Sequence, residues 1–217
     1  LAVLEMGMYA LGEIALLCEI AQPQVGVVTN VGPVHLERLG SIERIAQAKA
    51  ELVQALPSDG LAILNGDDAR VRAMAALTPA PSLTYGLGAE NDVRALAVEP
   101  LGLEGISLRV QVRARPDVGL AAQEMTLRSG LLGRHAALPA LAAVAVALAE
   151  GLPWEEIARG LEAAGPAMRL KPYRLANDAL LLDDSYNASP ASAEAALDFL
   201  ASLPGRRLAV LGDMLEL

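Results

Sequence analysis

The first third of the chain alternates short apolar runs with amphipathic helical patterns, and this alternation is the strongest constraint on its fold. Apolar runs typical of buried strands occur at Leu1–Leu4, Val25–Thr29 and Leu61–Leu64, with helical patterns between them at Leu11–Ala21 and Ile42–Leu56. A strand–helix–strand order of this kind predicts a parallel sheet with crossover helices. We therefore expect an α/β fold whose functional groups gather at the carboxyl ends of the strands.

The pattern changes between Asn91 and Arg128. Polar and apolar residues alternate there and glycines recur, which predicts a partly exposed antiparallel β region inserted in, or appended to, the parallel sheet. The elements expected after it are two helices, a strand, a helix and a last strand, at Arg134–Glu150, Trp154–Ala164, Leu180–Leu182, Pro190–Leu203 and Leu208–Leu211. We place a domain boundary near Lys171-Pro172, so that residues 1–170 form one α/β domain and residues 171–217 begin a second.

Composition narrows the class of protein. Hydrophobic residues make up 53% of the chain, so a sizeable core can form, while a net charge of −9 and only 3% aromatic residues argue against nucleic-acid binding. The single cysteine excludes an internal disulfide framework and a four-cysteine zinc site. The longest apolar run, Ala136–Ala149, is too short to cross a bilayer. We expect a soluble cytoplasmic protein without a membrane span.

Lys49 is the most informative single residue. The helical pattern Ile42–Leu56 carries an apolar stripe, and helical spacing puts Lys49 in the middle of it. The stripe consists of Ile42, Ile45, Ala46, Leu52, Val53 and Leu56. A buried lysine must be paired, neutralised or modified. Either the amine reaches the rim of the stripe along its own flexible stem, or the neutral amine has captured CO₂ as a carbamate, an oxygen-donor anion that suits Mg²⁺.

Two further candidates follow predicted strands. Glu5 comes directly after the first apolar run, and His35 lies in the loop after the second, beyond a Gly32-Pro33 turn. A carboxylate and an imidazole at strand ends suit a ligand site. The alternatives are a solvated loop acid and a surface histidine.

A second group of candidates surrounds the proposed boundary. The polar run Asp183–Asn187 follows a predicted strand, and it suits either a ligand site or an N-cap turn for the next helix. Arg169 suits phosphate binding or a surface ion pair. His135 opens a helix, where anions are favoured, or packs there. Asp213 has the same strand-end geometry after the last apolar run.

The sequence lacks the common motifs for phosphate binding and for a serine nucleophile. The sequence contains no Gly-x-x-x-x-Gly-Lys-[Ser/Thr] loop, no Gly-x-Gly-x-x-Gly and no Gly-x-Ser-x-Gly. Both ends of the chain fall at predicted strands, where whole domains rarely stop, so we expect part of a longer protein. The residues alone indicate Mg²⁺ chemistry on an α/β fold without defining a reaction.

Seven segments, collinear along the chain, resemble the Mur ligase family, and within it the member that adds D-alanyl-D-alanine to UDP-N-acetylmuramoyl-tripeptide. They are Leu4–Gly7 with Gly12–Ile14, Thr29–Glu37, Ala48–Glu51, Gly133–His135, Met168–Leu170, Asp183–Ala188 and Leu211–Leu217. The resemblance implies most of a central ATPase domain and the opening of a Rossmann-like C-terminal domain. The UDP-binding domain and the phosphate loop would then lie upstream.

The resemblance also implies a reaction and a set of residues. ATP would phosphorylate the tripeptide carboxylate, and the D-alanyl-D-alanine amine would attack the acyl phosphate in peptidoglycan precursor synthesis. The positions matched to Mg²⁺ binding and catalysis are Glu5, His35 and carbamylated Lys49. The positions matched to ATP binding are Arg169, Asp184, Asn187 and His135. We expect the enzyme to be a monomer.

One departure and two alternatives qualify this interpretation. Ala136 and Pro139 stand where the family has asparagines facing adenine, so we expect the base to be held by packing and backbone groups. The alternatives are another ATP-dependent Mur-type or folylpolyglutamate-synthase-like ligase, and a non-catalytic binding module. Without a phosphate loop, we expect these 217 residues alone to be inactive.

Overall fold

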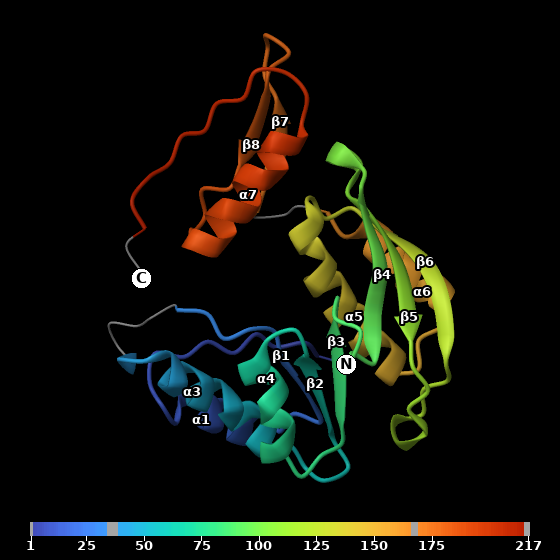
Figure 1. The fold of residues 1–217 in the computed structure, drawn as a ribbon. Helices are drawn as coiled ribbons and strands as arrows, with labels where there is room; N and C mark the ends of the chain where they lie inside the picture. Colours follow the sequence, from blue (N-terminus) through green and yellow to red (C-terminus); the bar gives the residue numbers. More distant parts are fainter. Residues whose placement is uncertain (1, 34–38, 166–168, 215–217) are drawn as a thin grey trace.

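The computed structural model describes residues 2–33, 39–165 and 169–214. Its main body is a six-stranded sheet in which the strands follow chain order, β1 to β6 (Figure 1). The strands are β1 (Val25–Val28), β2 (Leu61–Asn65), β3 (Ser82–Gly86), β4 (Val93–Pro100), β5 (Ile106–Val112) and β6 (Gln123–Ser129). Strands β1 to β4 pair in parallel, and β5 and β6 add antiparallel. The predicted fold class is therefore confirmed.

Helices cover both faces of this sheet (Figure 1). One layer contains α1 (Glu13–Ala21), α3 (Ile42–Gln54) and α4 (Ala69–Ala73), and the other contains α5 (Ala137–Ala149) and α6 (Trp154–Ala163). Strand β2 is buried on both faces because its side chains alternate between the two layers. Ala62 and Leu64 pack with the first layer, and Leu61 and Ile63 with the second.

The antiparallel region is an extension of the parallel sheet, as one of the two predicted arrangements had it. In β5 every second residue is buried against α5 and α6, and the residues between them are polar and less buried. The buried residues of β5 are Ile106, Leu108, Val110 and Val112. Full burial of each such side chain contributes about 1.5–3 kcal/mol.

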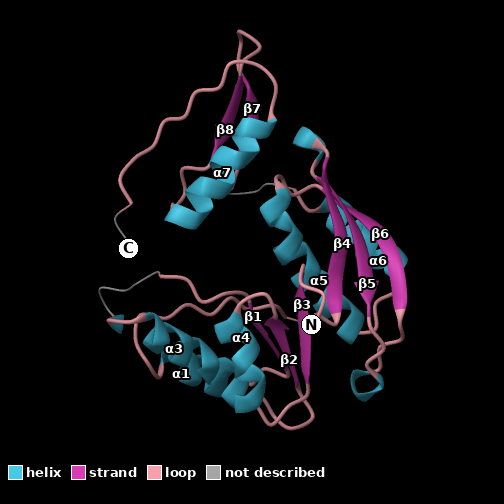
Figure 2. Ribbon diagram, in the orientation of Figure 1, coloured by secondary structure: helices cyan, strands magenta, loops and turns pink. Residues whose placement is uncertain are grey.

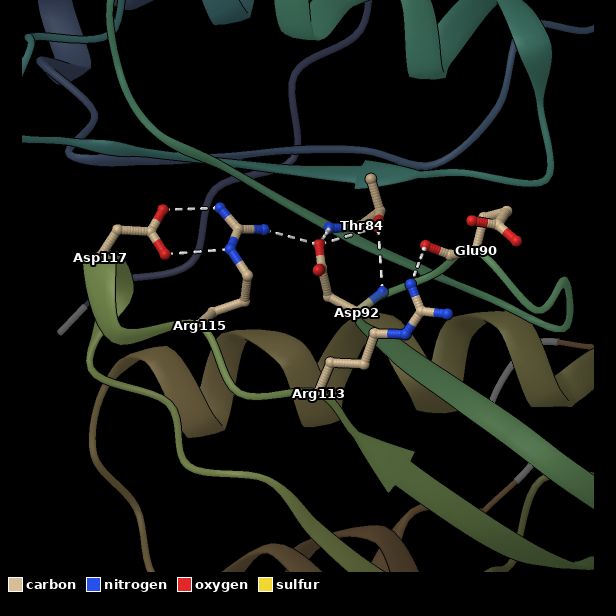
Figure 3. A network of polar contacts seen from close by, with 6 residues as sticks. All are labelled: Thr84, Glu90, Asp92, Arg113, Arg115 and Asp117. Atoms are coloured by element: carbon tan, nitrogen blue, oxygen red, sulfur yellow. Dashed lines mark hydrogen bonds and ion pairs between the residues drawn. The ribbon is translucent and has the colours of Figure 1, made fainter.

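A polar network ties the antiparallel region to β3 (Figure 3). One carboxylate oxygen of Asp92 accepts hydrogen bonds from the backbone N–H of Thr84 at 2.8 Å and from its hydroxyl at 2.9 Å. The guanidinium of Arg115 lies between two carboxylates, 2.8 Å from Asp92 and 2.7 Å from Asp117. These bonds raise the pKa of Arg115 and lower that of Asp117. The network therefore joins β3, the residue directly before β4 and the loop after β5.

A second, two-stranded sheet begins at the predicted boundary. Strands β7 (Lys171–Arg174) and β8 (Leu180–Asp183) pair antiparallel. Helix α7 (Pro190–Ser202) starts with a capping box between Ser189 and Ser192. The described chain continues beyond α7 as a loop to Met214 (Figure 2). The division into two domains stays a prediction.

Two predicted strands are wrong. Ala2–Leu4 and Leu208–Leu211 form no ladder among the described residues, and Val3 is 88% and Val210 99% exposed. An apolar run becomes a strand only when a neighbouring strand pairs its backbone groups. The parallel set instead includes β3, which the sequence did not reveal because its Ser82, Thr84 and Gly86 weaken the apolar signal. None of the helices in the described part of the chain has the length and hydropathy that a bilayer crossing needs.

Candidate active site at the strand ends

The carboxyl ends of β1 and β2 meet through side-chain contacts. The amide nitrogen of Asn65, at the end of β2, donates to the carbonyl of Thr29 at 2.8 Å. The N–H of Val31 donates to a carboxylate oxygen of Asp68 at 2.7 Å. The polar groups at these two strand ends therefore gather as parallel-sheet geometry predicts.

Lys49 faces this meeting point from α3. Its amine donates to the carbonyl of Asn30 at 2.7 Å, and its side chain is half-buried. Burial lowers the pKa of the Lys49 amine, and the negative charge of Asp68 opposes that effect. The predicted position within the apolar stripe thus places this amine against the loop that follows β1.

Two adjacent aspartates follow β2 and face different partners. One oxygen of Asp68 caps α4 by accepting from the N–H groups of the helix at 2.9 and 3.2 Å, while its other oxygen holds Val31. Asp67 instead accepts from Leu87 N–H at 2.6 Å, Gly88 N–H at 2.9 Å and the Asn91 amide at 2.8 Å. Asp67 lines an open cavity of about 560 Å³ at the ends of β2 and β3.

Glu5 lies in an exposed coil before α1, and His35 lies outside the described residues. The start of α1 is fixed by Glu51 of α3, whose carboxylate accepts from Gly12 N–H at 2.7 Å and Ala15 N–H at 3.0 Å. Helix α3 therefore holds both the segment that follows Glu5 and the loop after β1.

A magnesium ion at this site would need side chains that supply oxygen ligands. Within residues 2–33, 39–165 and 169–214 there is no group of three or more histidine, cysteine, aspartate or glutamate side chains arranged for a metal ion. An unmodified Lys49 amine is not an oxygen donor, whereas a carbamate on it would be. The metal set of Glu5, His35 and Lys49 stays a prediction that requires the modified lysine.

The predicted nucleotide residues lie together around β7 and β8. A carboxylate oxygen of Asp184 accepts from Leu170 N–H at 3.2 Å, Arg169 donates to the carbonyl of Asn187, and the Arg169 guanidinium lies 5.5 Å from the ring centre of Tyr186. Arg169 and Asn187 are exposed and Asp184 is half-buried, so all three remain accessible to a ligand. Their roles stay predictions.

His135 belongs to the same neighbourhood. Partial burial lowers the pKa of His135, and the charge of Asp184 opposes the shift. Gly133 has φ of +81°, and a Cβ there would come within 2.7 Å of the imidazole, so this glycine makes room for the histidine. A cavity of about 150 Å³ is lined by His135 together with residues of α7, among them Asp198 and Phe199.

The two positions that depart from the family pattern have different surroundings. Ala136 is 4% exposed and packs in the main core, so its side chain faces no ligand. Pro139 is exposed in the first turn of α5, where its missing N–H breaks no intrahelical hydrogen bond.

Sequence reasoning did not identify Asn65, Asp68 and Glu51 as supports of the site. Asn65 and Asp68 follow the apolar run Leu61–Leu64, which was predicted as a strand, but the sequence does not indicate which of their side chains contacts the neighbouring loop. Glu51 belongs to the segment Ala48–Glu51 that carries the family resemblance, but no role was predicted for it. Only the packing of α1 against α3 makes it a cap.

Comparisons with known proteins show a consistent likeness. A family model described as the Mur ligase middle domain matches residues 1–147, and one described as the Mur ligase glutamate ligase domain matches residues 168–217. The chain is 39% identical over 218 residues to the UDP-N-acetylmuramoyl-tripeptide–D-alanyl-D-alanine ligase of Synechocystis, and this match covers 100% of the chain and 44% of that protein.

Solved structures agree with this likeness. MurF from Acinetobacter baumannii is 32% identical with a TM-score of 0.87, and the match covers 99% of this chain and 45% of that one. MurF from Thermotoga maritima in complex with ADP is 24% identical with a TM-score of 0.76, covering 91% and 44%, and this likeness supports the fold alone. The chain spans less than half the length of these relatives.

Proposed function

We propose, because the chain belongs to the Mur ligase family, that the protein carrying it is an ATP-dependent amide ligase. It would add D-alanyl-D-alanine to UDP-N-acetylmuramoyl-tripeptide in peptidoglycan precursor synthesis, in the cytoplasm. The observation that carries the proposal is the half-buried Lys49 amine, which donates a hydrogen bond to the Asn30 carbonyl where the ends of β1 and β2 meet. Similarity to relatives named for this activity supports the choice of substrates.

In this proposal the strand-end site handles the acyl phosphate. The tripeptide carboxylate attacks the γ-phosphorus of ATP and ADP leaves. The D-alanyl-D-alanine amine then attacks the acyl carbon, loses a proton and displaces phosphate. Both partners of the first step are anions, so the site must position them and neutralise charge. Glu5, His35 and carbamylated Lys49 would hold Mg²⁺, which supplies that neutralisation when bound.

The second group of residues would hold the nucleotide. Arg169 is exposed and permanently charged, which suits phosphate oxygens. Asp184 would accept hydrogen bonds from ribose hydroxyls, and Asn187 and His135 would contact the nucleotide nearby. With Ala136 buried, packing and backbone groups would hold the base.

The test measures phosphate release by the full-length protein. We expect release to require ATP, Mg²⁺, the UDP-linked tripeptide and D-alanyl-D-alanine together, and L-alanyl-L-alanine to fail as the amine donor. Equal turnover with glutamate or another amino acid would contradict the proposed substrate and favour a different ligase of this scaffold. Absence of any ATP-dependent amide product would contradict ligase function.

A further inference from the structure

Three side chains from three elements hold three successive residues of the loop after β1. Asn65 of β2 donates to Thr29, Lys49 of α3 donates to Asn30, and Asp68 accepts from Val31, at 2.8, 2.7 and 2.7 Å. We call Asn65 and Asp68 the strand-end clamp. The three residues that are held precede His35 in the sequence.

We propose that the strand-end clamp consists of positioning residues for the ligase reaction, which fix the Asn30 carbonyl and through it the Lys49 amine. The inference rests on the proposed function and names residues that touch Lys49's partner loop rather than the substrate.

Each clamp residue is itself fixed by its own turn. Asn65 is 4% exposed, and its side-chain oxygen accepts from Asp67 N–H at 3.0 Å, which leaves the amide nitrogen to face Thr29. Asp68 is anchored by its cap on α4. In both residues one polar atom of the side chain is already hydrogen-bonded within the turn between β2 and α4, so the other polar atom has a fixed position. The turn therefore determines where the loop after β1 lies.

Lys49 depends on this arrangement for its direction. A lysine side chain has four rotatable carbon–carbon bonds. A half-buried amine therefore keeps one orientation only when a fixed acceptor holds it. Asn30 is exposed and its carbonyl belongs to a loop, so in the described part of the chain the acceptor is held through its neighbours Thr29 and Val31. Loosening either neighbour would release the amine.

Asp67 supplies a matched control. Like Asp68 it is an aspartate in the same turn that accepts three N–H groups, but none of its partners belongs to the loop after β1. Asp67→Asn therefore makes the same chemical change one residue away. Asn65→Ala is a second test variant, and it alters no charge.

The experiment uses the full-length protein with Asp68→Asn, Asn65→Ala and Asp67→Asn. Asn is as good an N-cap as Asp, so Asp68→Asn keeps the α4 cap and loses the acceptor for Val31. Mg²⁺ is titrated in the ligase assay, and hydrogen exchange is followed at the single amide of Val31. Both clamp variants should raise the half-saturating Mg²⁺ concentration or lower kcat by about tenfold or more, with KM for D-alanyl-D-alanine nearly unchanged.

Asp68→Asn should make the Val31 amide exchange about tenfold faster because its charge-assisted hydrogen bond is lost. Asn65→Ala should also speed exchange there because the loop is no longer held at Thr29, while Asp67→Asn should leave both readouts near wild type. Wild-type exchange at Val31 in both clamp variants would overturn the clamp. Faster exchange with unchanged Mg²⁺ dependence and kcat would overturn its role in positioning. A wild-type protein without ligase activity would refute the proposed function, and exchange would still decide whether the clamp exists.

Discussion

Tyr85 shows how strongly a single buried group can make stability depend on pH. It is 1% exposed at the end of β3, and burial together with the charge of Asp67 raises its pKa to about 12. The folded state therefore favours the neutral phenol. Its contribution to stability is complete below pH 10, the unfolded value, and is lost as the pH rises towards about 12.

We expect the free energy of unfolding of wild type to fall faster than that of Tyr85→Phe above pH 10. The extra slope should be about 1.4 kcal/mol per pH unit, because only the unfolded state releases the phenol proton there. Denaturant unfolding at a series of alkaline pH values measures it. Tyr173→Phe, which removes an exposed phenol, should follow wild type. Parallel curves for wild type and Tyr85→Phe would rule out the shifted pKa.

For single residues, the sequence predicted where a side chain would lie better than it predicted its hydrogen-bond partner. The apolar stripe of α3 predicted that Lys49 would lie at a buried seam, because helical spacing is regular. It did not reveal that Asn30 would accept from the amine, because that bond depends on the loop between two strands that are neighbours only in the folded sheet. The place of His35 lies outside the described residues.

Helix α1 depends on a cap supplied by another helix. Its N-cap residue is Gly12, which has no side chain to offer, and Glu51 of α3 accepts from the N–H groups of Gly12 and Ala15 instead. We expect Glu51→Ala to lower the free energy of unfolding by about 1–2 kcal/mol, as the loss of an N-cap does. Chemical denaturation measures the change, and Glu51→Gln should lie between wild type and Glu51→Ala because one acceptor oxygen remains.

Gln47→Ala is the control for this substitution. Gln47 is exposed on the same helix, so its replacement changes helix propensity only slightly. If Glu51→Ala and Gln47→Ala are equally stable, the cap contributes nothing. Exchange at the amides of Gly12 and Ala15 should rise only in the Glu51 variants.

Helices with a strong hydrophobic periodicity were predicted well. Strands were predicted poorly where their formation depends on pairing with another strand. The bounds of α3 and α7 agree with expectation within a few residues, because an amphipathic stripe and a Ser-Pro start are local signals. Strand β3 was missed, and two apolar runs at the ends of the sequence were wrongly taken as strands. A strand exists only with a partner, and the identity of that partner is not a local property.

At the scale of the whole molecule, a small apolar cluster joins α7 to the main body. Its buried members are Leu132, Leu170, Phe199 and Leu203. We expect Phe199→Ala to lower the stability of β7, β8 and α7 by about 3 kcal/mol, through lost burial and a cavity. Exchange in the six-stranded sheet, which has its own two cores, should change little.

Hydrogen exchange resolved by segment measures this difference. Leu197→Ala, on the same helix but 39% exposed, should leave exchange in β7 and β8 close to wild type. Equal acceleration in both sheets would mean that the molecule opens as one cooperative unit and would contradict the expectation.

The six strands of the main sheet stand in the order in which a ribosome would deliver them. Each strand from β2 to β6 therefore finds a neighbour already synthesised, and none of these six described strands has to insert between two that have paired. The connections from β3 to β4, from β4 to β5 and from β5 to β6 are short, which favours rapid pairing of these neighbours, whereas the crossover from β1 to β2 is long and contains α3. Synthesis and sheet growth can proceed in the same direction, from β1 outward, with each new strand extending a template that is already in place.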